Sequence, residues 1–307
     1  MSLYLGIDGG GTKTKVVIID QNEHIIYENT GSASSIDTVS NDETYLVIKN
    51  ALSPYFDAHP NHVIDACFAG LGGVVFESDY HVVEDLIRKL PYIKEHAIIQ
   101  ARNDMENALY SGYCFEEGIA LISGTGMVAF GKHHDKTHKA SGWGYKEGEL
   151  GSAFHLGTEA IRYLIRAFDA RVEKDDFARD IAHIVEMNKT TDIMDVLDRY
   201  YDQRTKVASL APIVTKYANL NHPYAKSIVD QATDECALAI HAVYQQLSLK
   251  SPTLVIVGSL GNSDGYFKDQ LHKKIKQIDA HMNIIKPLID PAFAAALMAK
   301  KMNPFIQ

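Results

Sequence analysis

Near its start the chain reads Leu5-Gly6-Ile7-Asp8-Gly9-Gly10-Gly11-Thr12-Lys13-Thr14, between apolar runs at residues 3–7 and 16–19. This pattern predicts two strands joined by a glycine-rich turn. A plain hairpin turn needs about two residues, so the longer run of glycine and threonine indicates a second role. Glycines let backbone N–H groups approach an anion, and threonine hydroxyls add donors. We therefore predict a phosphate-binding loop with contacts from Gly10, Gly11, Thr12, Lys13 and Thr14.

The loop departs from the two most familiar nucleotide-binding patterns. The Gly-x-x-x-x-Gly-Lys-Ser/Thr spacing of a Walker A loop is absent. A strand is expected after the loop, whereas a helix follows the glycines of a Rossmann fingerprint. Asp8, at the end of the first strand, suits a Mg²⁺ ion held through water, because that ion keeps several of its waters. An ordinary tight hairpin with three glycines is the alternative interpretation.

The pattern of strand, glycine turn, strand and helix occurs twice. Its second copy has a strand at 118–123, the turn Ser123-Gly124-Thr125-Gly126 and a strand at 127–130. We expect Gly124, Thr125 and Gly126 to hold phosphate from the side opposite the first loop. Two related α/β halves that face each other form a cleft, where ligands commonly bind.

The remaining segments complete an α/β chain of two domains. We expect the first domain at residues 1–112, onto which a terminal helix at 292–307 can pack, and the second at 113–291 with a helical insertion. The polar stretch after residue 130 is expected to be a solvated turn that holds His133, His134 and His138. Other strands are expected at 24–28, 62–68, 96–100, 253–257 and 283–285, and helical segments at 42–56, 80–90, 104–111, 151–249 and 292–301.

A carboxylate follows the expected strand at 96–100, in the segment Arg102-Asn103-Asp104. At the junction of a strand and a helix such a side chain can reach into a cleft and take the proton of a substrate hydroxyl. Spacing alone favours another interpretation, in which Asp104 only caps the helix that follows.

Two later glycine-rich segments also suit ligands. The stretch 141–152 holds the one tryptophan of the chain, Trp143, and the carboxylate Glu149, and such aromatic faces and acids suit polyhydroxylated molecules. The alternative is a buried tryptophan that anchors a loop. Gly258-Ser259 follows the strand at 253–257, where a glycine admits a flat ring such as adenine. A turn that leads into a helix explains this segment equally well.

Composition argues against several other classes of protein. The 307 residues include 30 Lys and Arg against 39 Asp and Glu, a net charge of −9, which disfavours binding to nucleic acid or to an anionic membrane. No apolar run reaches the ~18–20 residues of a membrane span. Cys67, Cys114 and Cys236 are too far apart for a local metal or redox motif. We therefore expect a cytoplasmic protein without a signal peptide.

In this order the segments resemble the BadF/BadG/BcrA/BcrD ATPase family, which includes N-acetylglucosamine kinases and related amino-sugar kinases of the actin/hexokinase-type superfamily. The resemblance spans essentially the whole chain. Its matching segments are Gly6 to Thr14 (first phosphate motif), Gly70-Leu71-Gly72-Gly73 (connecting segment), Asn103-Asp104 (catalytic position), Ser123 to Gly126 (second phosphate motif), Gly142 to Ser152 (sugar-side loop) and Leu254 to Gly261 (adenosine motif).

The resemblance implies two RNase H-like domains with ATP and Mg²⁺ in the cleft between them. It also implies transfer of the γ-phosphoryl group to a sugar hydroxyl, the 6-OH, with Asp104 as the general base and Asp8 holding the metal through water. Gly258 and Ser259 would contact the nucleotide. Kinases of this family are often dimers, so a homodimer is expected. Residues expected at the sugar are Ser34, Ser35, Gly72, Asp104, Thr125, Trp143 and Glu149.

Three departures from the family pattern fall on the sugar side. Glu149-Leu150 stands where Asp-Glu is usual, and Met127 stands where a small serine is usual. The segment Ser32-Ala33-Ser34-Ser35-Ile36-Asp37 lacks the asparagine that the family often offers to the sugar. The sugar and the hydroxyl therefore stay open, with N-acetylglucosamine, N-acetylmuramic acid and glucosamine among the choices.

Two other functions compete with the kinase interpretation. Activators of 2-hydroxyacyl-CoA dehydratases resemble this fold, but they hold an Fe–S cluster between subunits through cysteines, and the cysteines here are scattered. A non-catalytic sugar sensor would share the scaffold, but it would not need both Asp8 and Asp104.

Overall fold

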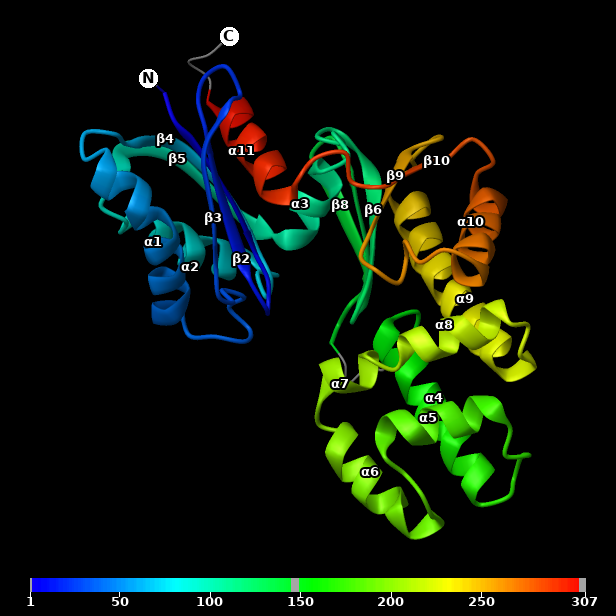
Figure 1. Cartoon of the computed structure of the whole chain (residues 1–307). Helices are drawn as coiled ribbons and strands as arrows, with labels where there is room; N and C mark the ends of the chain where they lie inside the picture. Colours follow the sequence, from blue (N-terminus) through cyan, green and yellow to red (C-terminus); the bar gives the residue numbers. More distant parts are fainter. Residues whose placement is uncertain (1, 145–148, 304–307) are drawn as a thin grey trace. The chain divides into compact units, whose positions relative to one another are not determined.

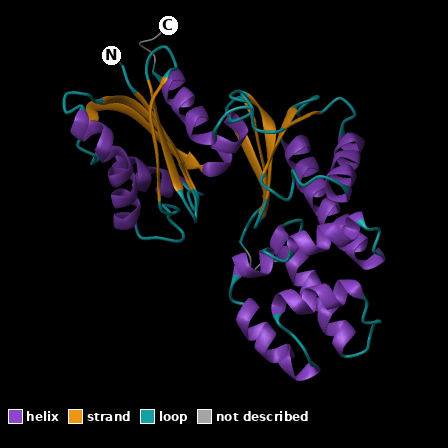
Figure 2. Cartoon of the chain, in the orientation of Figure 1, coloured by secondary structure: helices purple, strands orange, loops and turns teal. Residues whose placement is uncertain are grey.

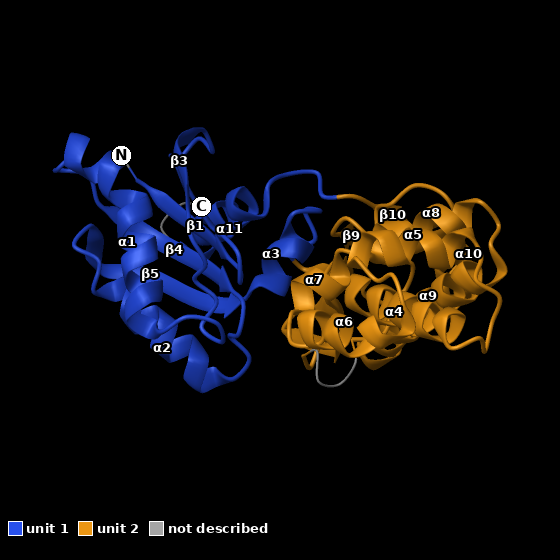
Figure 3. Ribbon diagram, turned by 60° about the horizontal axis from the view of Figure 1, so that its bottom comes forward, with its two compact units in different colours: residues 1–115, 287–307 blue, residues 116–286 orange. Residues whose placement is uncertain are grey.

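The computed structural model describes residues 2–144 and 149–303, which form mixed α/β structure with two five-stranded sheets (Figure 1; Figure 2). The chain divides into two compact units (Figure 3). The first unit runs to Phe115 and resumes at Pro287, and the second is Glu116–Lys286. Residues 304–307 of the expected terminal helix lie outside the described residues, as does Gly148 of the expected sugar-side loop.

The first sheet has the strand order β3-β2-β1-β4-β5. Its first three strands form antiparallel pairs, whereas β4 pairs with β1, and β5 with β4, in parallel. The central strands β1 and β4 are buried and mostly apolar, as expected for strands covered on both faces. The strand bounds are β1 (Tyr4–Gly9), β2 (Thr14–Ile19), β3 (Ile25–Gly31), β4 (Ile64–Leu71) and β5 (Ile93–Asn103).

The second sheet repeats this arrangement with the order β10-β9-β6-β7-β8. Here β6, β7 and β8 form antiparallel pairs, while β9 pairs with β6, and β10 with β9, in parallel. The expected duplication of one α/β half is therefore confirmed by the sheet order. The strand bounds are β6 (Glu117–Ser123), β7 (Met127–His133), β8 (Lys136–Ser141), β9 (Thr253–Val257) and β10 (Asn283–Ile285).

One strand was missed by the sequence pattern. The stretch after residue 130 is not a long polar turn, because β7 continues to His133 and β8 follows as the edge strand. None of the residues of β8 is fully buried, so its sequence carries no apolar signal. His134 alone of the three histidines lies in the turn, with a φ of 54°. Among the described residues no cluster of histidines, cysteines and acids could hold a metal.

Helices of the first unit flank its sheet. The helix α1 begins with a capping box, in which Ser40 Oγ accepts from Glu43 N–H and Glu43 Oε2 accepts from Ser40 N–H at 2.9 Å. The helix α11 packs along β1, β2 and β4, and the contact is close because Gly6 has no side chain. The helix bounds are α1 (Asn41–Ala58), α2 (Glu77–Arg88), α3 (Asp104–Tyr110) and α11 (Pro291–Met302).

The second unit adds a large helical segment after its first three strands, as expected for residues 151–249. The long helix α9 packs on β6, β7 and β8 and against α10. No helix in the described part of the chain is long and apolar enough to cross a membrane. The helix bounds are α4 (Ala153–Phe168), α5 (Asp176–Val185), a 3₁₀ turn (Thr190–Asp192), α6 (Ile193–Tyr200), α7 (Arg204–Ala208), α8 (Ala211–Asn219), α9 (Pro223–Gln246) and α10 (Tyr266–Ile278).

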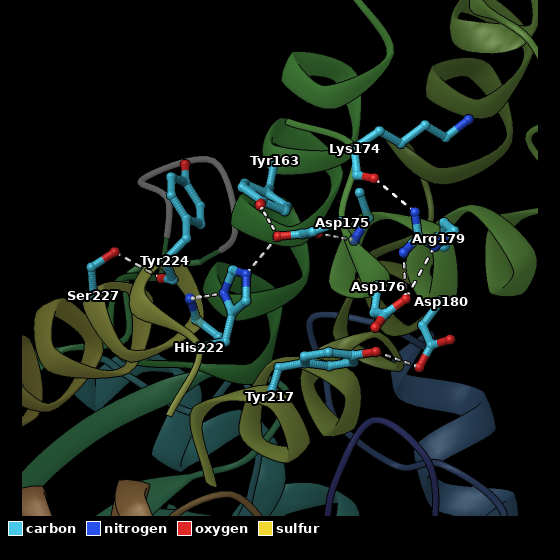
Figure 4. A network of polar contacts seen from close by, with 12 residues as sticks. Tyr163, Lys174, Asp175, Asp176, Arg179, Asp180, Tyr217, His222, Tyr224 and Ser227 are labelled. Carbon is cyan, nitrogen blue, oxygen red and sulfur yellow. Dashed lines mark hydrogen bonds and ion pairs between the residues drawn. The ribbon is translucent and has the colours of Figure 1, made fainter. Parts of the chain in front are cut away.

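One carboxylate ties three of these helices together (Figure 4). Asp175 caps α5, because its Oδ1 accepts from Ala178 N–H at 2.9 Å. Its Oδ2 bonds with the hydroxyl of Tyr163 on α4 at 2.5 Å and lies 2.7 Å from Nε2 of His222, which caps α9. The first N–H groups of a helix have no partner within it, and Asp175 satisfies one of them in α5. Because the same carboxylate also contacts Tyr163 and His222, it links α5 to α4 and to the start of α9.

The packing of α11 on β1 gives a stability prediction. A Cβ at Gly6 would overlap the backbone of α11 at Ala292 and Ala296 and lie 2.9 Å from the carbonyl carbon of Ala295. We expect Gly6→Ala to lower the free energy of unfolding by about 3 kcal/mol, since backbone cannot move aside as a side chain can. Urea unfolding measures the change. Gly10→Ala is the control, because its nearest neighbour would be 3.9 Å away, and an equal loss in both variants would contradict the assignment.

Candidate active site

The first glycine loop joins β1 to β2, and Gly9 pairs with Thr14 at its base. Gly10 N–H donates to Lys13 O at 3.0 Å, so this amide closes the loop rather than facing a ligand. Thr14 is buried, and its hydroxyl lies 2.7 Å from both Ser32 O and Ser34 Oγ. These residues shape the loop, whereas Gly11, Thr12 and Lys13 are exposed at its tip.

Ser34 and Ser35 lie beneath this loop. Both serines are buried, and their N–H groups donate to Gly10 O at 3.2 and 3.3 Å. Ser35 Oγ forms a short hydrogen bond with Asp37 Oδ1. Of the two serines expected at the sugar, Ser34 is hydrogen-bonded to the hydroxyl of Thr14, and Ser35 is hydrogen-bonded to the carboxylate of Asp37.

Gly72 separates Ser35 from the expected catalytic residue. A Cβ at Gly72 would lie 2.5 Å from Ser35 Oγ and 3.6 Å from Asp104 Oδ2, so a side chain at this position would crowd both. Gly72 N–H donates to Gly9 O at 2.8 Å, which fixes this segment to the end of β1. The first loop, Ser35, Gly72 and Asp104 therefore meet at one end of the first sheet.

Asp104 is not the cap of α3. The cap is Asn103, whose side chain accepts from Met105 N–H at 3.1 Å, so the carboxylate of Asp104 is not needed for that role. Burial, with smaller contributions from the charges of Asp8 and Asp37, raises the pKa of Asp104 to about 7. A carboxyl with such a pKa can exchange a proton near neutral pH, as a general base must.

Asp8 lies at the end of β1 and is held by a side chain of α3. Asn107 Nδ2 donates to Asp8 Oδ1 at 2.8 Å and to Ile7 O at 3.0 Å. Burial raises the pKa of Asp8 to about 6, while the Asn107 hydrogen bond opposes that rise. Asn107 Oδ1 is fully buried and has no hydrogen-bond partner among the described residues. A Cβ at Gly70 would overlap the Asn107 amide, which explains the glycine there.

The second glycine loop joins β6 to β7 and is closed in the same way. Gly124 N–H donates to Gly126 O at 3.0 Å. The loop carbonyls Gly124 O and Thr125 O accept from the first N–H groups of α4, at 2.8 and 3.2 Å. The expected adenosine segment packs on it, since Gly261 N–H donates to Ser123 O at 3.0 Å. Gly258 has a φ of 100°, a conformation that favours glycine.

These two segments line one pocket of about 410 Å³ within the second unit. The pocket brings together Thr125 and Ser259, both expected at a nucleotide, and it adds residues of α4, α7 and α8 that no sequence motif indicated. Its volume and mixed polar and apolar lining suit a small organic ligand such as a nucleoside. The lining residues are Thr125, Ala153, Thr205, Ala208, Ser209, Ala211, Pro212, Thr215, Ser259, Leu260 and Ser263.

The residues of this unit that were expected near the sugar differ in how far they are exposed. Trp143 is 66% exposed, with Lys139 Nζ 4.0 Å from its ring centroid, so the alternative of a buried anchor is wrong. Glu149 is 2% exposed, and Arg204 Nε donates to its Oε2 at 2.8 Å. Met127 packs in the core of the unit, so this departure from the family pattern reflects packing. Leu150 is 40% exposed.

Three site residues escaped the sequence analysis. Asn107 lies three residues after Asp104 on α3, and no sequence motif marked it. Asp37 was noticed only as part of a departure from the family pattern. Arg204 lies 55 residues beyond Glu149, at the start of α7, and no local pattern marks it.

The chain matches known proteins over nearly its whole length. The profile of the BadF/BadG/BcrA/BcrD ATPase family matches residues 5–299. An N-acetylmuramic acid/N-acetylglucosamine kinase from Clostridium acetobutylicum is 28% identical over 306 residues, 98% of this chain and 99% of that protein. An N-acetyl-D-glucosamine kinase from Dictyostelium discoideum is 26% identical over 315 residues, 97% of each chain.

Solved structures share the fold over the full length. A Chromobacterium violaceum protein, provisionally named an N-acetylglucosamine kinase, has a TM-score of 0.74 at 21% identity and covers 97% of this chain and 99% of its own. A ROK family glucokinase from Streptomyces griseus, solved with glucose and AMPPNP, has a TM-score of 0.58 at 14% identity and covers 98% and 100%. At these identities the likeness shows the fold alone.

The raised pKa of Asp104 predicts that this residue destabilises the protein at alkaline pH. The carboxyl loses its proton near 3.8 when exposed and near 7 in the folded protein. The folded state therefore binds more protons between these values, and the free energy of unfolding falls as pH rises through about 7. We expect Asp104→Asn to be more stable than the parent by about 2–4 kcal/mol at pH 8, with the gain vanishing near pH 4.

Urea unfolding at both pH values checks this, with Asp79→Asn as a control of opposite sign. Asp79 accepts from Phe76 N–H at 2.8 Å and from Val75 N–H at 2.9 Å, and these bonds lower its pKa. Removing its charge should lower stability at neutral pH. An Asp104→Asn protein no more stable than the parent at pH 8 would contradict the assigned environment.

Proposed function

Because the chain belongs to the BadF/BadG/BcrA/BcrD ATPase family, we propose that it is an ATP-dependent kinase of amino sugars. The observation that carries the proposal is Asp104, a carboxylate with a pKa raised to about 7 beside an exposed glycine loop and a side-chain-free position at Gly72. Relatives that match nearly the whole chain are named as kinases of N-acetylmuramic acid and N-acetylglucosamine, which supports this substrate class.

In the proposed reaction Asp104 is the general base. Its carboxylate takes the proton of the sugar 6-OH as that oxygen bonds to the γ-phosphorus of ATP, and the bond from the γ-phosphorus to the bridging oxygen breaks to leave ADP. Gly72 leaves room beside Asp104 Oδ2 for the attacking hydroxyl. Ser35, Thr125 and the exposed face of Trp143 are proposed to contact the sugar.

The nucleotide is proposed to bind through both glycine loops. Gly11, Thr12 and Lys13 are exposed at the tip of the first, and the pocket beside Thr125 and Ser259 suits the adenosine. Gly258 shapes the turn beneath that pocket. Backbone N–H groups and hydroxyls at such loops suit phosphate oxygens, and positioning supplies most of the catalysis in phosphoryl transfer.

Asp8 fits the role of holding Mg²⁺ through water. It is a half-buried carboxylate at a strand end, close enough to Asp104 that its charge raises the pKa of Asp104, and a divalent cation relieves such repulsion. The buried, unpartnered Asn107 Oδ1 beside it is an acceptor that a bound water can use. When bound, the ion would neutralise phosphate charge.

The cysteines argue against the activator function. Cys67, Cys114 and Cys236 are all buried, and burial raises the pKa of Cys67 and Cys236, to about 12 for the latter. A cluster shared between subunits needs exposed thiolates. As part of the kinase proposal, we also propose a cytoplasmic location and a homodimer.

The first test is ADP release from Mg-ATP against a panel of amino sugars and plain hexoses. We expect turnover with N-acetylglucosamine or N-acetylmuramic acid, and we expect Asp104→Asn to lower kcat by about 10²–10⁴-fold, the usual contribution of a general base. Asp42→Asn, an exposed acid in the first turn of α1, is the matched control and should keep full activity. Bound ATP with no stimulation by any amino sugar would overturn the proposal.

The pH dependence follows from the raised pKa. Asp104 must be ionised to accept the proton, so kcat/KM for the sugar should rise about tenfold per pH unit below about 7 and level off above it. The charge of Asp8 contributes to the raised pKa of Asp104, so the midpoint of the pH profile also depends on Asp8. Initial rates from pH 5.5 to 8.5 at saturating Mg-ATP measure it. A profile flat over this range would mean that the reaction does not depend on this base.

A further inference from the structure

An ion pair between the buried Glu149 and the partly exposed Arg204 lies directly against the second glycine loop. Arg204 Nε donates to Glu149 Oε2 at 2.8 Å, and Arg204 Nη2 bonds with Glu149 Oε1. A Cβ at Gly126 would overlap Arg204 Nη2 and lie 2.8 Å from Glu149 Oε1. The guanidinium and the loop backbone are therefore in contact, and only glycine at position 126 leaves room for this.

The acid of this pair is fixed to the same loop through its backbone. Glu149 has a φ of 43°, in the left-handed region that non-glycine residues rarely adopt, and its carbonyl accepts from Ser152 N–H at 3.1 Å. The next N–H group, that of Ala153, donates to Gly124 O at 2.8 Å. Strained backbone held in this way points to a functional constraint on the side chain.

The cation of the pair stays accessible although its partner does not. The side chain of Arg204 is 41% exposed, against 3% for that of Glu149. Thr205, the next residue of α7, lines the pocket together with Thr125 and Ser259. Within the described part of the chain, Glu149 is the one hydrogen-bond partner of the guanidinium, which leaves Nη1 and its two N–H groups for another acceptor.

We propose that Arg204 is a further nucleotide-binding residue, which contacts the terminal phosphates of ATP while Glu149 positions it. The inference rests on the proposed function, because its ligand is the nucleotide of that site. A planar guanidinium presents its donors in a fixed fork that matches phosphate oxygens, and a carboxylate on the opposite edge holds the fork in one orientation. Glu149 is thereby a positioning residue for Arg204 and not a contact of the sugar.

The position of the contact predicts which nucleotides depend on it. Arg204 lies at Gly126 of the phosphate loop, whereas the adenosine is proposed to lie in the pocket beyond Thr125. Loss of the guanidinium should therefore weaken the binding of ATP far more than the binding of AMP. If the ion pair had only a structural role, its loss would weaken the binding of all nucleotides alike, through disorder of the loop, or would weaken none of them.

The test is the affinity of purified protein for AMP, ADP and ATP, measured by calorimetry for the parent and three variants. We expect Arg204→Gln to weaken ATP binding about 10–100-fold and AMP binding less than about threefold, since a hydrogen bond between charged groups is worth that much. Arg204→Lys keeps the charge but not the fork and should recover only part of the loss. It also serves if the glutamine variant does not fold.

Lys206→Gln is the matched control. Lys206 lies on the same short helix, and its Nζ donates to Arg199 O at 3.1 Å, so the variant removes the same charge without touching the loop. It should bind ATP as the parent does. An unchanged ratio of ATP to AMP affinity in Arg204→Gln or Arg204→Lys would overturn the inference, as would an equal loss in Lys206→Gln.

The outcome is separable from that of the sugar assay. A parent protein that prefers ATP to AMP but phosphorylates no amino sugar would remove the kinase proposal, while the ratio in the Arg204 variants would still decide the inference. A parent that phosphorylates an amino sugar, with Arg204 variants that keep the ratio, would remove only the inference.

Discussion

The crowding of three carboxylates at one end of the first sheet explains much of the local architecture. Burial raises the pKa of Asp104, and the charges of Asp8 and Asp37 add to that rise. Such a cluster is unfavourable unless each acid has a donor. Asn107 donates to Asp8 and Ser35 to Asp37, and glycines at the end of β4 let both donors approach. The asparagine, the serine and the glycines at these positions are thus explained together by the need to stabilise the neighbouring carboxylates.

Most of the fold could be predicted because its signals are local. Apolar runs bounded by glycines marked β1, β4, β6 and β9, and the repeated turn marked the duplication. The edge strand β8 could not be found in this way. It lies beside β7 with no residue fully buried, so its pairing depends on β7 being present and not on its own composition.

The site was predictable in its backbone and less so in its side chains. Glycine turns at strand ends indicate where phosphate can approach, and both loops lie there. Whether a side chain faces a ligand or supports the loop depends on neighbours distant in sequence, as Thr14 shows by turning to Ser34. Asp104 was ambiguous until Asn103 was seen to cap the helix. Arg204 reaches the loop across 55 residues, a relation that only the tertiary structure reveals.

The two loops have the same backbone design but different surroundings. In each loop a glycine N–H closes the turn by donating to a carbonyl of the same loop, Gly10 to Lys13 and Gly124 to Gly126. The acids Asp8 and Asp104 lie beside the first loop, which itself carries Lys13, whereas the ion pair of Arg204 and Glu149 lies against the second. Proton removal from a hydroxyl needs a base, whereas the phosphoryl group carries negative charge that a base would repel. A duplicated fold can meet both needs, because after duplication each copy can acquire its own charged side chains around the same backbone loop.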